Sequence, residues 1–181
     1  EVIDNSIDEF IMGHGKRVVV TCKKGIVTIR DYGRGIPLGK LVECVSVIDT
    51  GAKYNDDVFQ FSVGLNGVGT KAVNALSSYF KVIAYRNGKY SQAIFEKGKL
   101  ISRVKLGKAP DEQDGTYIEF IPDVDIFGEY TFSNDFIEQR MWNYAYLNSG
   151  LRLIFNRVKF ESKHGLLDLL KAEVGYSGLY D

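Results

Sequence analysis

The feature that most constrains the fold is a series of β-branched and aromatic runs separated by tight turns. Residues 80–86 and 90–96 flank Asn87-Gly88, a pair typical of two-residue β-hairpin turns. Further strands are predicted, several of them ending at Gly-containing turns, at residues 16–22, 26–30, 100–106, 116–121 and 151–155. Because most of these strands follow one another through short turns, we expect a mixed, mostly antiparallel sheet.

Helical patterns are interspersed with these hairpins. The predicted helices cover residues 1–11, 38–48, 70–78, 135–147 and 165–174. For the helix at 135–147, the spacing predicts a buried side made of Phe136, Ile137, Met141, Tyr144 and Ala145. We therefore predict an α+β fold, a two-layer sandwich with the helices on one face of the sheet. A length of 181 residues suits a single domain spanning residues 1–181.

Composition restricts the classes of function. The 23 basic and 23 acidic residues give a formal net charge of zero, which disfavours tight binding of DNA or RNA by this chain alone. The two cysteines, Cys22 and Cys44, lie in apolar runs, as expected for buried thiols in a reducing compartment such as the cytoplasm. We see neither a signal peptide nor a membrane-spanning run. The chain starts without Met inside a predicted helix, so we expect a fragment.

The first helix collects acidic side chains on one face. At 100° per residue, Glu1, Asp4, Asn5, Asp8 and Glu9 share a side, and Ile3, Ile7, Phe10 and Ile11 lie opposite. The face lacks the Lys or Arg partners common on exposed helices, and an Asn inside a helix favours a side-chain role. The amide oxygen of Asn5 could bind Mg²⁺, which takes oxygen ligands. The alternative is an ordinary solvated face.

Two glycine-rich segments follow. Asp31 ends a predicted strand and precedes Gly-x-Gly-x-Pro at residues 33–37. A polar stretch at 49–62, which lacks periodicity, leads into Gly-Leu-Asn-Gly-Val-Gly at 64–69 and then a helix. Bare backbone N–H groups at a helix start favour phosphate, although an ordinary turn is the alternative. The spacing matches neither a Walker A loop nor a Rossmann fingerprint.

These motifs in this order resemble the GHKL superfamily of ATPases, most closely the B subunits of bacterial type IIA topoisomerases, DNA gyrase and topoisomerase IV. Residues 1–9, 31–37 and 64–77 resemble the first three motifs of the family. Asp114-Gly-Thr-Tyr-Ile-Glu-Phe120 is similar to the fourth, and Tyr146-Leu-Asn-Ser-Gly150 to the segment before the last strand. The resemblance covers nearly the whole chain and implies the Bergerat-type ATP-binding fold.

The resemblance implies a role for each matching residue. Glu1 would be the general base that activates water, and Asn5 would bind Mg²⁺. Asp31 would accept a hydrogen bond from the amino group of adenine, assisted by Thr116 through a water molecule. Gly35 would let the purine approach. The phosphates of ATP would be wrapped by Gly64, Leu65, Asn66, Gly67, Val68 and Gly69, with Lys53 adding a positive charge. The rim, where aminocoumarin-type inhibitors bind in this family, would include Glu9, Arg34, Ile36, Pro37 and Arg86, with a salt bridge between Glu9 and Arg34.

Several alternatives remain at this stage. Lys53 could be a solvated loop residue, Arg86 an exposed strand end, and His14 and His164 ordinary surface residues. Asn66 stands where gyrase and topoisomerase IV commonly have His, and the segment 37–53 is shorter than is usual in gyrase. The chain could also belong to a mismatch-repair, chaperone or histidine-kinase branch of the superfamily. A module that senses nucleotide without catalysis is a third possibility.

The resemblance also implies partners. In the intact enzyme, ATP binding would close a homodimer, and hydrolysis would drive DNA strand passage with a topoisomerase A subunit that cleaves DNA. DNA would be bound by the full-length enzyme and not mainly by this domain. The N-terminal arm for dimerisation and the transducer domain, which supplies a lysine to the γ-phosphate site, are expected to be missing here. We therefore expect weak or undetectable hydrolysis by this chain alone.

Overall fold

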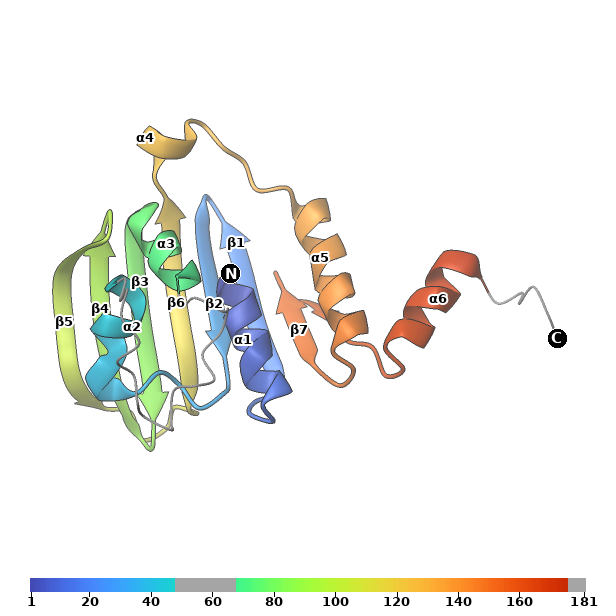
Figure 1. The fold of residues 1–181 in the computed structure, drawn as a ribbon, viewed down its shortest axis with the longest axis horizontal. Coiled ribbons are helices and arrows are strands. Elements are labelled where there is room, and N and C mark those ends of the chain that lie inside the picture. Colours follow the sequence, from blue (N-terminus) through green and yellow to red (C-terminus); the bar gives the residue numbers. More distant parts are fainter. Residues whose placement is uncertain (48–67, 176–181) are drawn as a thin grey trace.

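Eight strands form one mixed sheet in the part of the chain that the structure describes. The structure, a computed structural model, describes residues 1–47 and 68–175. The strands lie in the order β5-β4-β3-β6-β2-β1-β7-β8 (Figure 1). Their bounds are β1 Arg17–Lys23, β2 Ile26–Asp31, β3 Ser77–Arg86, β4 Lys89–Glu96, β5 Lys99–Lys108, β6 Gly115–Pro122, β7 Arg152–Phe155 and β8 Val158–Phe160.

The sheet is antiparallel except at one pair. β1 runs parallel to β7, with Val18 opposite Leu153, and all other neighbouring strands in the described sheet are antiparallel. The Asn87-Gly88 turn between β3 and β4 has positive φ at both residues, 52° and 69°, as a primed hairpin turn requires. The same sign pattern occurs at Lys24-Gly25 and Lys97-Gly98. The predicted hairpins and the mostly antiparallel sheet are confirmed.

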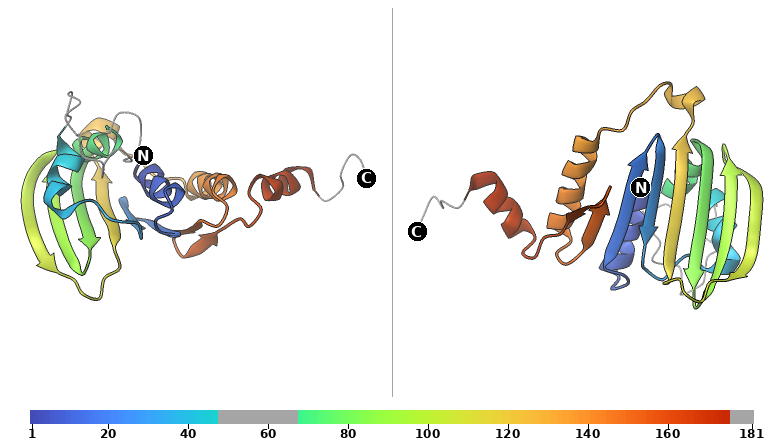
Figure 2. Two further views of the ribbon diagram at one scale, coloured as in Figure 1. Left: turned by 60° about the horizontal axis from the view of Figure 1, so that its bottom comes forward. Right: turned by 180° about the vertical axis from the view of Figure 1, so that it is seen from behind.

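Helices α1, α2 and α3 cover one face of the sheet. The right panel of Figure 2 shows the molecule from behind, so that the sheet lies in front of these helices. The left panel shows α1, α5 and α6 side by side. The helix bounds are α1 Val2–Ile11, the 3-10 helix η1 Leu38–Lys40, α2 Leu41–Ser46, α3 Gly69–Ala75, α4 Val124–Phe127, α5 Asn134–Leu147 and α6 Leu166–Val174. This arrangement confirms the predicted α+β sandwich.

The core lies between the helical layer and the sheet. Alternate residues of the strands point into it, including Val18 and Val20 of β1 and Phe80 and Val82 of β3, all nearly inaccessible to solvent. From the helices, Val2 and Ile7 of α1 and Leu41 of α2 are buried in the same cluster. Because α1 packs with its apolar side inward, its polar side is free to line a site.

Several element predictions are wrong in detail. The predicted helix at 38–48 begins as a 3-10 turn, and its α-helical part ends at Ser46. The predicted helix at 70–78 ends at Ala75, because Ser77 is buried as the first residue of β3 and pairs with Pro122. The short elements α4 and β8 lie in segments where the sequence pattern predicts neither a helix nor a strand.

One predicted core position is also wrong. Phe136 lies in the first turn of α5 with 58% of its surface exposed, whereas Met141 and Ala145 further along the helix are fully buried. Ile11, the last residue of α1, lies on the apolar side of the helix and is 66% exposed. Cys22 and Cys44 are free thiols of intermediate burial, and desolvation raises the pKa of Cys44 to about 11. Neither thiol is fully buried, in contrast to the prediction of buried thiols.

Candidate functional site

The candidate site lies where α1, the end of β2 and the start of α3 approach one another. α1 crosses the sheet over β1 and β2, and α3 lies next to α1 and contacts β3 and β4 (Figure 1). The site therefore combines residues from the first, second and third predicted motifs. Each of these motifs contributes a polar side chain or a glycine at a close contact.

Asp31 is the most buried carboxylate of the site, with 7% of its surface exposed. Its Oδ1 accepts hydrogen bonds from the backbone N–H groups of Gly33 at 3.0 Å and Thr116 at 3.1 Å. Among the described residues, no hydrogen bond is made to Oδ2. Burial raises the pKa of Asp31, and the two backbone bonds act in the opposite direction. One oxygen of the carboxylate is thus fixed while the other is left to accept a donor.

The turn after Asp31 depends on two glycines. A Cβ at Gly33 would lie 2.8 Å from the Cβ and Oε2 of Glu9, so a larger residue would push α1 away. Gly35 has φ of +71°, and a Cβ there would lie 2.5 Å from the carbonyl oxygen of Tyr85 and 2.8 Å from that of Gly115. The structure therefore gives Gly35 a packing role against β3 and β6. Its predicted contact with a purine stays a prediction.

Glu9 and Arg34 form the predicted salt bridge. Arg34 Nη2 donates to Glu9 Oε1 at 2.8 Å, and Arg34 Nε donates to Oε2 at 3.1 Å. The backbone N–H of Arg34 donates to the same Oε2 at 2.9 Å. Burial disfavours the charge on Glu9, but the bonds from Arg34 outweigh it and hold the pKa of Glu9 below its usual value. This fork-like pair fixes the turn against α1.

Glu1 and Asn5 lie one turn apart on α1 and face the start of α3. An ideal Cβ at Gly69 would lie 1.7 Å from Glu1 Oε2, so the Glu1 carboxylate occupies the space that this glycine leaves free. Asn5 Nδ2 donates a short hydrogen bond to Thr70 Oγ1. The Oδ1 atom of Asn5 is buried and has no hydrogen-bond partner among the described residues.

The buried Oδ1 atom of Asn5 is a suitable ligand for a hard divalent cation that takes few ligands from the protein. A buried amide oxygen without a partner is uncommon, and a cation is one of its explanations. Mg²⁺ prefers oxygen ligands and usually takes only one or two from protein, the rest coming from water and phosphate. Among the described residues, no cluster of three or more His, Cys, Asp or Glu could hold a metal by itself. Asn5 therefore suits a cation that arrives with a phosphate ligand.

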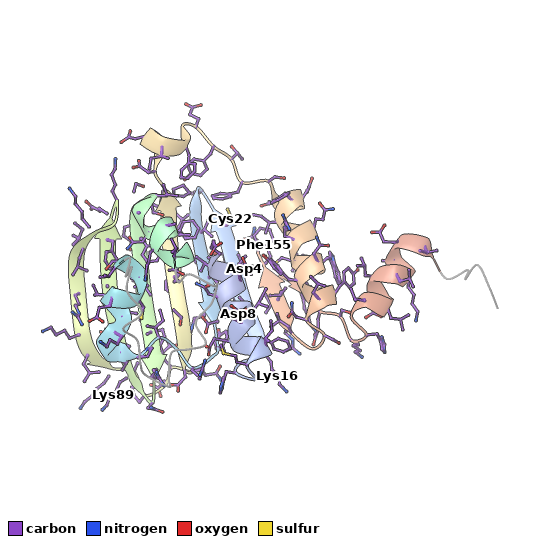
Figure 3. The ribbon with its side chains drawn as sticks, viewed as in Figure 1. Asp4, Asp8, Lys16, Cys22, Lys89 and Phe155 are labelled. Atoms are coloured by element: carbon purple, nitrogen blue, oxygen red, sulfur yellow. The ribbon has the colours of Figure 1, made fainter. Side chains whose placement is uncertain are left out.

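The remaining carboxylates of α1 have separate surroundings. Tyr144 of α5 donates its hydroxyl to Asp4 Oδ1 at 2.7 Å. Burial raises the pKa of Asp8, and the charges of Asp4 and Glu9 add to this effect. Asp4 and Asp8 both lie on α1, and Asp4 faces α5 (Figure 3). The stripe of Glu1, Asn5 and Glu9 therefore faces the site, and the acidic residues do not form one solvated face.

The other predicted residues divide into described and undescribed sets. Thr116 contacts Asp31 through its backbone, and the side chain of Arg86 passes near Gly35, with its Cγ 3.2 Å from the ideal Cβ position. Ile36 packs against the core, Pro37 precedes the 3-10 helix, and Val68 is 40% exposed before α3. Lys53, Gly64, Leu65, Asn66 and Gly67 lie outside the described residues.

Sequence reasoning assigns no role to Thr70. It enters only as part of the segment 64–77 that resembles the third motif and as the first residue of the predicted helix at 70–78, and its contact with Asn5 spans 65 positions. The available signal is its place directly after Gly-Val-Gly, one residue from the glycine that contacts Glu1.

Among the described residues, no helix has the length and apolar character needed to cross a membrane.

Comparisons with individual proteins and with solved structures give consistent matches, whereas a comparison with family models does not. No family model matches the chain. The chain is 59% identical over 174 residues to the B subunit of DNA topoisomerase 4 from Borreliella burgdorferi, covering 96% of this chain and 29% of that protein. It is 35% identical to the B subunit of DNA gyrase from Thermus thermophilus, covering 91% of this chain and 27% of that protein. The chain thus spans less than a third of the length of these relatives.

A solved structure matches over almost the whole chain. It is the 43K ATPase domain of Thermus thermophilus gyrase B in complex with an aminocoumarin, with a TM-score of 0.84 and 29% identity. The match covers 99% of this chain and 50% of that one. These matches agree with the family that the order of the motifs indicates. The chain belongs to the bacterial type IIA topoisomerase B subunits, the family of DNA gyrase and topoisomerase IV, and matches their GHKL-type ATPase region.

Proposed function

We propose that residues 1–181 form one ATP-binding domain, which in the intact subunit hydrolyses ATP to drive DNA strand passage. The observation that carries this proposal is the Asp31 carboxylate, buried and held at one oxygen by two backbone N–H groups. The names of the relatives support a type IIA topoisomerase, either topoisomerase IV or gyrase. The intact enzyme would act in the bacterial cytoplasm with an A subunit, and as a homodimer closed by ATP.

Adenine would be recognised by the free oxygen of Asp31. The exocyclic amine of adenine donates a hydrogen bond, whereas guanine has a carbonyl oxygen at that position. A buried carboxylate would repel this oxygen and lose its donor, so the site would discriminate against guanine. The hydrogen bonds from Gly33 and Thr116 keep the carboxylate in one orientation. The β2 end and the β6 start would thereby form the floor of the adenine pocket.

The phosphate end would lie between α1 and the start of α3. Glu1 would take a proton from the water that attacks the γ-phosphate, as a correctly placed carboxylate can do. Asn5 would hold Mg²⁺ through Oδ1, and that ion would neutralise charge on the phosphates when bound. Gly69, together with the segment 64–68 and Lys53, would surround the phosphates. The absence of a side chain at Gly69 leaves room for the Glu1 carboxylate beside the reacting phosphate.

The rim of the pocket would bind aminocoumarins, as the solved Thermus thermophilus domain does. Arg34 is held in place by Glu9, and Arg86 lies beside Gly35 at the same edge. The two arginine side chains would supply hydrogen-bond donors, and Ile36 and Pro37 would supply an apolar surface. An inhibitor with an aromatic body and polar substituents fits such an edge.

Calorimetric titration of the chain with ADP and with an aminocoumarin tests this proposal. We expect Asp31→Asn to weaken both ligands by about ten- to a hundredfold, since hydrogen bonds to charged groups contribute about 1.5–3 kcal/mol. Asp111→Asn is the matched control, because it removes the same charge from an exposed loop residue. Wild-type chain that is folded but binds neither ligand would refute the proposed pocket. Equal affinities for the two variants would refute the role of Asp31.

A further inference from the structure

We propose that Thr70 is the positioning residue that orients the Asn5 amide for cation binding. This inference rests on the proposed function, because it concerns how the chain presents its Mg²⁺ ligand. The relevant contact joins two helices, α1 and α3, whose contacting residues are 65 positions apart. Neither the comparisons nor the sequence motifs assign a role to the Thr70 side chain.

An asparagine amide presents two chemically opposite ends. Its oxygen can bind a cation, whereas its NH₂ group carries partial positive charge and would repel one. The two ends are nearly equal in size, so packing alone does not select between the two orientations. Here Nδ2 donates to Thr70 Oγ1, and Oδ1 is left buried without a partner among the described residues. The contact with Thr70 therefore determines which end is available to a ligand.

A threonine in a helix is suited to this task. Its hydroxyl oxygen can accept a hydrogen bond at its lone pairs while its own proton is donated to another group. Thr70 lies in the first turn of α3, next to Gly69, whose missing side chain leaves space for Glu1. The same turn of α3 thus sets the positions of both the proposed base and the proposed metal ligand.

The helix that carries Thr70 is itself anchored. Asn74, one turn further along α3, is 1% exposed, and its Nδ2 donates to the carbonyl oxygen of Val45 in α2 at 2.9 Å. α3 is therefore tied to α2 on one side and to α1 through Thr70 on the other. Metal ligands that are oriented by a fixed outer partner lose about 10- to 100-fold in metal affinity when that partner is removed.

The simpler interpretation is a tether between two helices. A tether would contribute to stability, and its removal would leave the Mg²⁺ dependence of nucleotide binding unchanged. A positioning role predicts the opposite pattern, because the amide without its acceptor would rotate and bury an unsatisfied NH₂ group or turn it toward the cation. The Mg²⁺ dependence, measured without hydrolysis, therefore separates the two interpretations.

The test is calorimetric titration with β,γ-imido-ATP over a series of Mg²⁺ concentrations. We expect Thr70→Val and Thr70→Ala to raise the Mg²⁺ concentration needed for half-maximal enhancement of binding by about 10- to 100-fold. Thr70→Ser keeps the hydroxyl and should stay within about twofold of wild type. Affinity measured without Mg²⁺ should be similar for all folded variants, and thermal unfolding shows that each variant is folded at the temperature of the titration.

A second comparison uses an Asn5→Ala background. If Thr70 acts through Asn5, adding Thr70→Val or Thr70→Ala to Asn5→Ala should change the Mg²⁺ dependence no further. A folded Thr70→Val or Thr70→Ala variant with wild-type Mg²⁺ dependence would overturn the proposal, as would an additive effect in the Asn5→Ala background. Wild-type chain whose binding ignores Mg²⁺ would also overturn it, whereas wild-type chain that binds no nucleotide would overturn the proposed function itself.

Discussion

Gly69→Ala is expected to impair turnover without impairing folding. An ideal Cβ at this position lies 1.7 Å from Glu1 Oε2 and 2.7 Å from its Cδ, whereas ordinary contacts begin at 3.4 Å. The carboxylate oxygen must therefore retreat by about 1.7 Å, and a misplacement of about 1 Å at a reacting group can cost about 10²-fold. We expect the ATP turnover of the full-length subunit, assayed with its A subunit, to fall by about 10²-fold.

Stability should move the other way in the same variant. Gly69 has no positive φ and opens helix α3, where alanine is favoured over glycine by about 0.5–1 kcal/mol. The Glu1 side chain is 63% exposed, so it can move away from the new methyl group into solvent. The melting temperature of the chain should therefore stay the same or rise, and affinity for an aminocoumarin should not change.

Two controls make the turnover assay specific. Gly39→Ala adds the same methyl group where no neighbouring atom lies within 4 Å, and should leave turnover unchanged. In a Glu1→Ala background, Gly69→Ala should cause little further loss, because both changes act on one carboxylate. The reasoning is refuted if a folded Gly69→Ala enzyme keeps turnover within about threefold of wild type.

Two further predictions concern Asp31 and Gly35. Burial raises the pKa of Asp31, so ADP affinity should be constant above that raised pKa and fall by up to about tenfold per pH unit below it as the free carboxylate is protonated. Calorimetry of wild type against Asp31→Asn checks this, since the loss on acidification should be absent in the variant. Gly35→Ala combines a φ of +71° with clashes against two backbone carbonyls, and should lower the free energy of unfolding in urea by about 2–4 kcal/mol. Gly13 has φ of +87° and no neighbour within 4 Å, so Gly13→Ala should lower the free energy of unfolding by only about 1 kcal/mol. Equal losses in the two variants would show that the clashes at Gly35 do not affect stability.

Local chemistry makes several features predictable. Asn87-Gly88 specifies a primed turn because both residues tolerate positive φ, and the alternation of apolar residues on either side predicts a half-buried hairpin. The pairing of Glu9 with Arg34, 25 positions apart, is instead predicted by the family resemblance, and their salt bridge confirms it. In contrast, the burial of Phe136 is predicted from helical spacing alone, which does not tell where along a helix the sheet ends.

The family, the order of the three motifs and most of the elements that carry them can be read from the chain, because turns, helix periodicity and glycine requirements are local properties. Which atoms meet depends on tertiary packing. Asp31 Oδ1 is bonded by the backbone of Thr116, 85 positions away, and Asn5 turns its NH₂ group to Thr70, 65 positions away. These contacts depend on how α1 and α3 pack on the sheet, and packing sums many weak interactions between distant residues, which spacing along the chain does not encode.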